Sequence, residues 1–99
     1  MNMQNLMAQA QKLQKEIQQK QKEIDETVFD GESEWVNLTM TGKREIKSLN
    51  IKKGTINDDD DLEMLEDMVT LAVNDVLKKI EAETSKKLGA YGQGLGGLM

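Results

Sequence analysis

The sequence predicts an α+β protein in which a helix, a three-stranded antiparallel sheet and a second helix follow one another. Apolar residues recur every three or four positions near both ends of the 99-residue chain, which is the period of an amphipathic helix. Between these regions, short segments with β-branched and aromatic residues alternate apolar and polar positions, as half-buried strands do. Gly31, Gly42 and Gly54 follow these segments, so each predicted strand ends at a break.

The first predicted element is a long helix from about Asn2 to about Glu26, a stretch without glycine or proline. Its apolar residues form a heptad seam, which consists of Met3, Leu6, Ala10, Leu13, Ile17 and Ile24. Lys20 occupies the one gap in this seam. Such a seam needs a partner to pack against.

Three strands are expected next, over the ranges Glu26–Asp30, Trp35–Thr41 and Glu45–Lys52. In the third strand, Ile46 has the opposite parity to Leu49 and Ile51, so their side chains would point to opposite faces of a regular strand. A β-bulge or a late strand start would reconcile the two sets.

The last helix, from about Asp59 to about Leu88, contains the long apolar segment Leu62–Ile80. Apolar side chains cover at least half of this segment's surface, and Met64 and Leu71 lie outside the main stripe. A single packing partner cannot cover all of this surface. Three strands under one helix also leave a sheet edge open. We therefore expect a symmetric homodimer.

Residues 1–88 should form a single domain, because a chain this short is of single-domain size. The following segment, residues 89–99, holds five of the chain's eight glycines. We expect it to be a flexible C-terminal tail. The last turns of the second helix should project beyond the sheet.

The composition argues against an enzyme, a cofactor site or a metal site. The chain has no cysteine and no histidine, which removes thiolate ligands and the commonest general base. The run Asp58–Asp61 could bind a hard metal ion, but it lacks the spaced ligands of a calcium loop. Capping of the second helix explains the run better. No segment has the length and hydropathy of a membrane span or a signal peptide, so we expect a soluble cytoplasmic protein with no membrane and no small-molecule substrate.

The net charge of −5 is unevenly distributed along the chain. Eight of the 18 acidic residues lie between Asn57 and Leu77, a segment with no basic residue. The rest of the chain carries 13 basic and 10 acidic residues, a net charge of +3. A separate basic face is therefore compatible with the acidic total.

Two groups of lysines are candidates for phosphate contacts. Lys12, Lys15 and Lys22 share the helix face opposite the apolar seam. The alternative is a solvated face with local ion pairs such as that between Glu16 and Lys20. The second group, Lys78, Lys79, Lys86 and Lys87, either contacts phosphates or complements the helix dipole. Trp35 could similarly stack on a base or pack against the core.

Three stretches carry a resemblance to a known family. The segments MNMQNLMAQAQKLQKEI, VNLTMTGKREIKSLNI and EMLEDMVTLAVNDVLKKIE, in this order, resemble the YbaB/EbfC family of bacterial nucleoid-associated proteins. The resemblance implies a cytoplasmic homodimer with projecting helical arms that binds DNA in the nucleoid. It places the DNA contacts on the arms, at Lys12, Lys15, Lys20, Lys22, Lys78, Lys79, Lys86 and Lys87.

The leading hypothesis is a non-enzymatic protein that binds double-stranded DNA electrostatically and acts in nucleoid organisation and gene regulation. The alternative is a homodimeric protein–protein interaction module linked to replication or recombination, with weak or no DNA binding.

Overall fold

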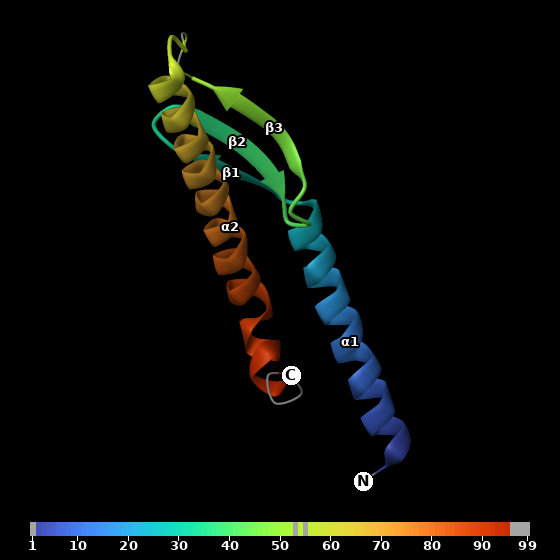
Figure 1. The fold of residues 1–99 in the computed structure, drawn as a ribbon. Coiled ribbons are helices and arrows are strands. Elements are labelled where there is room, and N and C mark those ends of the chain that lie inside the picture. The colour runs from blue at the N-terminus through green and yellow to red at the C-terminus, as the bar shows by residue number, and fades with distance from the viewer. Residues whose placement is uncertain (1, 53, 55, 96–99) are drawn as a thin grey trace.

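The computed structural model describes residues 2–52, 54 and 56–95 and has the predicted α-β-β-β-α order. Its elements are α1 (Met3–Glu26), β1 (Val28–Glu32), β2 (Val36–Thr41), β3 (Ile46–Ile51) and α2 (Asp59–Leu95). Figure 1 shows that α2 crosses the sheet, while α1 and the C-terminal half of α2 extend beyond the same end of it. The predicted fold class is confirmed, and the last turns of α2 project as expected.

The three strands form one antiparallel sheet in the order β1-β2-β3. The register between β2 and β3 shifts between Thr39 and Met40, so Met40 lies opposite Ile46 while Leu38 lies opposite Leu49. This irregularity confirms the predicted bulge. Because residues opposite each other point to the same face, Ile46 joins Leu49 on the face that carries the core.

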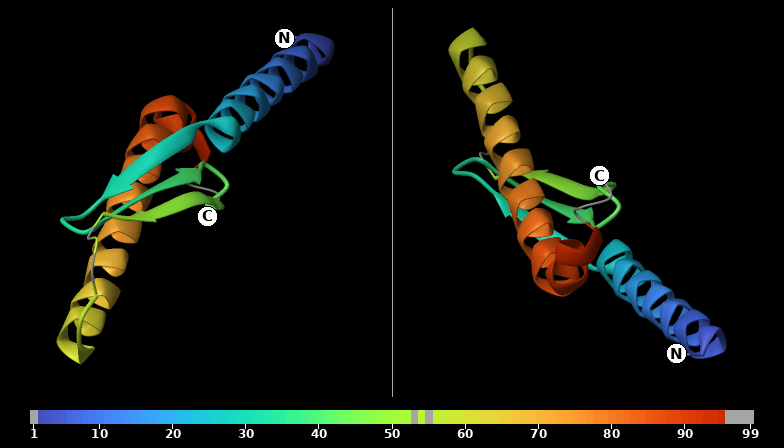
Figure 2. Two further views of the ribbon diagram at one scale, coloured as in Figure 1. Left: turned by 90° about the horizontal axis from the view of Figure 1, so that it is seen from above. Right: turned by 90° about the horizontal axis from the view of Figure 1, so that it is seen from below.

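The core lies between this sheet face and one side of α2. Val36, Leu38 and Met40 of β2 are buried against the α2 residues Ala72, Val76 and Ile80. Trp35 is half-buried against the same cluster, which confirms packing as its role in the fold. Figure 2 shows that α2 covers one sheet face and that, within the described residues, no helix covers the other.

Gly31 allows α2 to lie directly against β1. A Cβ atom at this position would collide with the Ala72 carbonyl oxygen and would lie 2.7 Å from Val76 Cβ. Any larger residue would therefore have to push the helix away from the strand.

The aspartates before α2 cap the helix. Asp61 N donates a hydrogen bond to Asp58 Oδ1 at 2.9 Å, and Asn57 N donates to Asp61 Oδ2 at 3.0 Å. These bonds satisfy backbone donors at the helix start, as expected for a capping sequence.

The second helix is longer than predicted, because α2 continues to Leu95 rather than ending near Leu88. Glycine is unfavourable in helices by about 1 kcal/mol, which led us to expect a flexible tail from residue 89. Contacts with α1 support the extra turns: Tyr91 Oη donates to Glu16 Oε2 at 3.4 Å. The segment is thus helical as far as Leu95, and residues 96–99 lie outside the described residues. The division of the chain into a domain and a tail at residue 88 stays a prediction.

Replacing Gly31 with alanine should lower the free energy of unfolding by about 1–3 kcal/mol, because the added methyl overpacks the contact between β1 and α2. Urea denaturation monitored by circular dichroism measures this loss. The matched control is Gly89→Ala, where the same methyl meets no atom within 4 Å and lies within α2. The control should leave stability unchanged or raise it by up to about 1 kcal/mol. Equal effects of the two substitutions would contradict the close contact at Gly31.

Candidate nucleic-acid interface

The helix α1 leaves most of its apolar seam uncovered within this chain. Met3, Leu6 and Leu13 are 74%, 44% and 46% exposed, and within the helix Ile24 is buried. The side of α1 that meets α2 is polar instead, since Glu16 contacts Tyr91 and Glu23 lies 3.6 Å from Lys87 Nζ. The seam and the neighbouring side chains of α1 therefore remain available to other molecules.

The cations of α1 begin only at Lys12, the tenth residue of this 24-residue helix. Residues 1–11 carry no charged side chain, and the first lysine is Lys12. Lys12, Lys15 and Lys20 line one shallow hollow of the helix surface, together with Glu16, Gln19 and Glu23. Lys22 is exposed but does not line this hollow, so the structure brings only part of the predicted set together.

The four lysines of α2 have different environments. Lys79 Nζ donates to the Asp30 carbonyl oxygen at 2.8 Å and lies 3.3 Å from Asp75 Oδ2. Lys87 is similarly engaged, with carboxylates of Glu23 and Glu83 within 4.0 Å. Lys78 and Lys86 are exposed, and neither forms an ion pair with a described residue. Two lysines of this group thus stabilise the fold, whereas the other two point to solvent.

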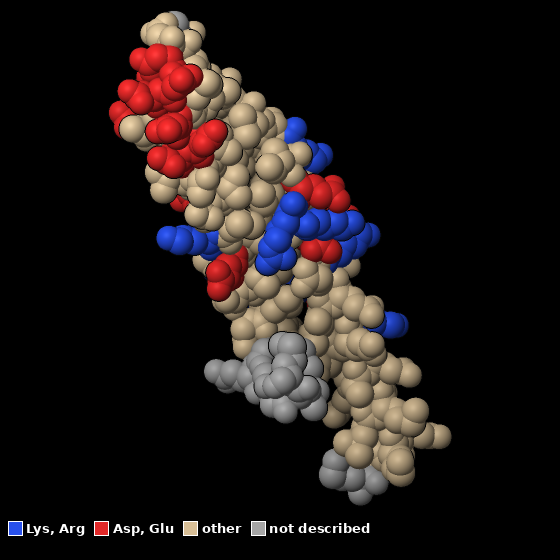
Figure 3. Space-filling view, viewed as in Figure 1, with Lys and Arg blue, Asp and Glu red and all other residues tan. Residues whose placement is uncertain are grey.

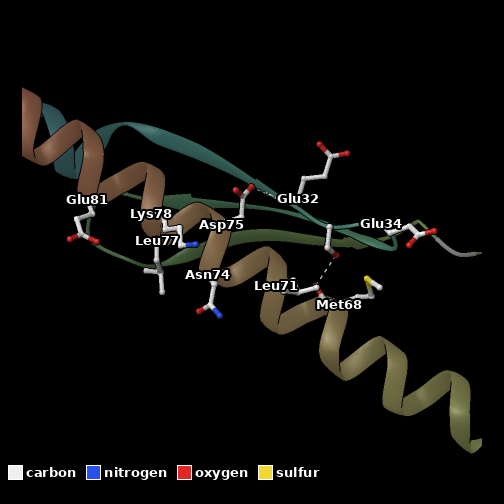
Figure 4. Close-up of a pocket in the computed structure, with 10 residues that line it drawn as sticks. Glu32, Glu34, Met68, Leu71, Asn74, Asp75, Leu77, Lys78 and Glu81 are labelled. Carbon is white, nitrogen blue, oxygen red and sulfur yellow. Dashed lines mark hydrogen bonds between the residues drawn. The ribbon is translucent and has the colours of Figure 1, made fainter.

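Glu32 and Asp75 are among the residues that line a groove beside α2 (Figure 4), and Asp75 also lies 3.3 Å from Lys79 Nζ. Glu32 N donates to Asp75 Oδ2 at 3.0 Å, and this bond, followed by that of Lys79, holds the pKa of Asp75 below its ordinary value. A hydrogen bond from Lys52, with Nζ 2.8 Å from Glu32 Oε1, likewise lowers the pKa of Glu32.

The polar groups of this groove serve the fold. Ser33 Oγ donates to the Met68 carbonyl oxygen at 2.7 Å, so this hydroxyl is occupied by the backbone of α2. The structure of residues 2–52, 54 and 56–95 contains no cluster of acidic side chains suited to holding a metal ion. None of the helices in these ranges combines the length and hydropathy needed to cross a bilayer.

The start of α2 carries many acidic side chains and no basic one. Figure 3 shows the largest acidic cluster there, whereas basic side chains lie among further acidic ones where the sheet meets the projecting helices. The acidic set comprises Asp58, Asp59, Asp60, Asp61, Glu63, Glu66 and Asp67. A polyanion could approach the basic side chains at the junction without meeting the acidic start of α2.

Residues 1–95 match the YbaB/EbfC DNA-binding family. The chain belongs to this family. It is 52% identical over 97 residues to a nucleoid-associated protein of Lactococcus lactis subsp. cremoris, covering 96% of this chain and 97% of the relative. Nucleoid-associated proteins of Streptococcus equi subsp. zooepidemicus and Streptococcus agalactiae are 46% and 44% identical over 93 residues, or 92% of this chain and 93% of each relative.

This YbaB/EbfC protein also carries two exposed cations that are not among the lysines predicted to contact DNA. Lys43 and Arg44 form the tip of the turn between β2 and β3. The signal that could have found them is the pair of adjacent basic residues after Gly42, at the tip of a predicted hairpin.

The Asp75 network makes the stability of this family member depend on pH. Because the folded-state pKa of Asp75 is lowered, its contribution is present above the ordinary value of 3.8 and is lost as the pH falls through the folded-state pKa. Asp75→Asn should therefore lower the urea midpoint at neutral pH, and its difference from wild type should shrink as the pH falls below 3.8. Asp67→Asn, on the exposed side of the same helix, is the control and should change the midpoint little. A constant difference from neutral to acid pH would show that the Asp75 charge does not stabilise the fold.

Proposed function

We propose that this protein binds double-stranded DNA without catalysing a reaction, and that it acts in the nucleoid by organising DNA and influencing gene expression. The observation that carries the proposal is the group of exposed lysines on α1, Lys12, Lys15 and Lys22, which belongs to a different element from the acidic start of α2. The family and the nucleoid-associated relatives support the same assignment.

The spacing of these lysines suits a contact with a phosphate backbone. At 1.5 Å per residue, Lys12 and Lys22 are separated by about 15 Å along the helix axis. Duplex DNA carries one charge per about 1.7 Å of its axis, so several phosphates come within reach of such a row. Lysine contacts of this kind position a protein on DNA without reading its sequence.

The α2 lysines contribute unequally to the proposed interface. Lys78 and Lys86 are exposed and can add phosphate contacts beside the arm. Lys79 and Lys87 would first have to leave their carboxylate partners, which reduces the net gain from binding DNA. Lys20 is half-buried, so in this proposal it attracts the DNA phosphates electrostatically, from the C-terminal part of α1, without contacting them directly.

The active form in this proposal is a symmetric homodimer. The helix α2 covers β1 and β2 but leaves the core face of β3 open, where Ile46, Leu49 and Ile51 are 52%, 43% and 42% exposed. Asp75 and Lys79 bind β1 from one flank of α2, so the opposite flank, with Leu62, Val73 and Leu77, faces the β3 side. A second copy offers the same two apolar surfaces, and a two-fold arrangement would bury both pairs together.

The substitution Leu49→Asp should convert the dimer to a monomer, because it places a carboxylate on the apolar surface of β3. Light scattering measures the mass in solution, and the wild-type value should be twice that of one chain. The control is Asn50→Asp, which adds the same charge on the opposite face of β3 and should remain dimeric. A wild-type Tm that rises with protein concentration would give independent support for the dimer. A monomeric wild-type protein at micromolar concentration would refute this part of the proposal.

Replacing Lys12, Lys15 and Lys22 together with glutamate should abolish binding to duplex DNA at about 0.1 M salt, because phosphate contacts become repulsive. The measurement is fluorescence anisotropy with labelled duplex DNA across a salt series. The triple Lys→Arg variant is the control and should bind like wild type, since it keeps the charges. Failure of the wild-type protein to bind duplex DNA at about 50 mM salt would exclude the proposal.

The exposed seam of α1 favours the second candidate function, an interaction module. A seam with heptad spacing can pack against an amphipathic helix of a protein partner, which could belong to replication or recombination. This candidate would stand if the wild-type protein failed to bind duplex DNA in the salt series described above.

A further inference from the structure

The turn between β2 and β3 contains an arginine in a backbone conformation that favours glycine. Thr41 N donates to the Glu45 carbonyl oxygen at 2.9 Å, and Arg44 N donates to the Thr41 carbonyl oxygen at 2.8 Å. Between them the chain turns through Gly42, Lys43 and Arg44, and Arg44 has a φ of 69°. Three-residue hairpin loops commonly end in such a left-handed residue, and glycine adopts it with the least strain.

The Arg44 side chain does not offset this strain by a contact within the chain. Its guanidinium is exposed and forms neither an ion pair nor a hydrogen bond with any residue that the structure describes. The adjacent Lys43 is also exposed. Residues with a strained backbone conformation cluster at functional sites, where the side chain serves binding rather than folding. A strained arginine whose side chain forms no ion pair or hydrogen bond within the described chain fits this description.

The turn is held firmly at the base of α1. Gly42 N donates to the Thr27 carbonyl oxygen at 3.1 Å, and a Cβ atom on Gly42 would collide with the Ile24 carbonyl. Figure 1 shows the turn beside the C-terminal end of α1, and the space-filling view shows basic side chains gathered at this junction. The backbone of the turn is therefore fixed relative to Lys20 and Lys22, which lie in the neighbouring turns of α1.

A purely structural explanation makes a different prediction. No basic residue lies in the last turn of α1, so Lys43 and Arg44 could instead complement the negative end of that helix dipole. Under this explanation, a neutral residue at position 44 would destabilise the fold. If the arginine is kept for binding, glycine at this position would relieve strain and stabilise it.

We propose that the turn between β2 and β3 is a second DNA-contacting element, in which Arg44 and Lys43 bind phosphates where the arm meets the sheet. The inference rests on the DNA binding proposed above and extends its surface beyond the helices. The planar guanidinium can donate two hydrogen bonds to one phosphate, a geometry that an ammonium group cannot provide. The contact positions the duplex and reads no bases.

Three variants test the role of Arg44 in anisotropy measurements with duplex DNA across a salt series. Arg44→Gly removes both the charge and the strain, Arg44→Asn removes the charge but tolerates the left-handed conformation, and Arg44→Lys keeps the charge. The control for charge loss is Lys52→Gln, since Lys52 lies at the other end of β3 and already pairs with Glu32. Thermal unfolding of each variant is measured in parallel.

The expected result separates binding from stability. In Arg44→Gly, the slope of log K against log salt should become shallower by about 0.9 for each arginine that contacts a phosphate, which is about eight-fold in affinity at 0.1 M salt. Its Tm should rise by about 4 °C. Arg44→Asn should lose affinity similarly. Arg44→Lys should keep the wild-type salt slope but lose part of the affinity, because it keeps the charge without the paired donors. Lys52→Gln should remain within about two-fold of wild type.

Three other results would overturn the inference in distinguishable ways. Wild-type affinity and slope in both neutral Arg44 variants would exclude the turn as a contact, while binding by the wild-type protein would leave the function proposed for the arms intact. Lower Tm values with unchanged DNA binding would assign Arg44 to the dipole of α1. Absence of DNA binding by the wild-type protein would overturn the proposed function and this inference together.

Discussion

The close contact between α2 and β1 at Gly31 fixes the position of the second helix and, through it, most of the surface. Because this contact holds α2 over β1 and β2, the core face of β3 remains open with three apolar side chains exposed. The same placement carries the second half of α2 past the sheet, where it meets α1. The absence of a side chain at Gly31 thus allows the helix position that leaves the apolar face of β3 open and brings the second half of α2 to α1.

The contact between the two long helices relies largely on polar side chains, while most of the apolar seam of α1 stays exposed. Helices usually pack through their apolar stripes, but only Ile24 of the α1 seam is buried, while Glu16 and Glu23 make polar contacts with α2. Exposed ion pairs of this type contribute about 1 kcal/mol or less each, so this contact holds the arm weakly. Most of the apolar seam of α1 and the exposed lysines of this helix therefore remain accessible to other molecules.

The sequence was sufficient to predict the elements that depend on local patterns. Periodicity located all five elements, the parity of Ile46 indicated the bulge, and the aspartates before α2 indicated a cap. The extension of α2 through Gly89 was missed, because contacts with α1 outweigh a low helix propensity. Sequence spacing also could not show that Lys79 and Lys87 have carboxylate partners, since these come from β1 and α1. The conformation of Arg44 contradicts residue preference and appears only in the fold.

Charged side chains are unevenly distributed along the 72 Å length of the molecule. The start of α2 is acidic, basic side chains gather near the turn between β2 and β3, and residues 1–11 have no charged side chain. In the field of a polyanion, the acidic start of α2 is repelled and the basic side chains are attracted before any contact forms. In a symmetric dimer, the dipole components perpendicular to the two-fold axis cancel, so the component along that axis would orient the dimer during approach. The part of α1 without charged side chains adds little to either force.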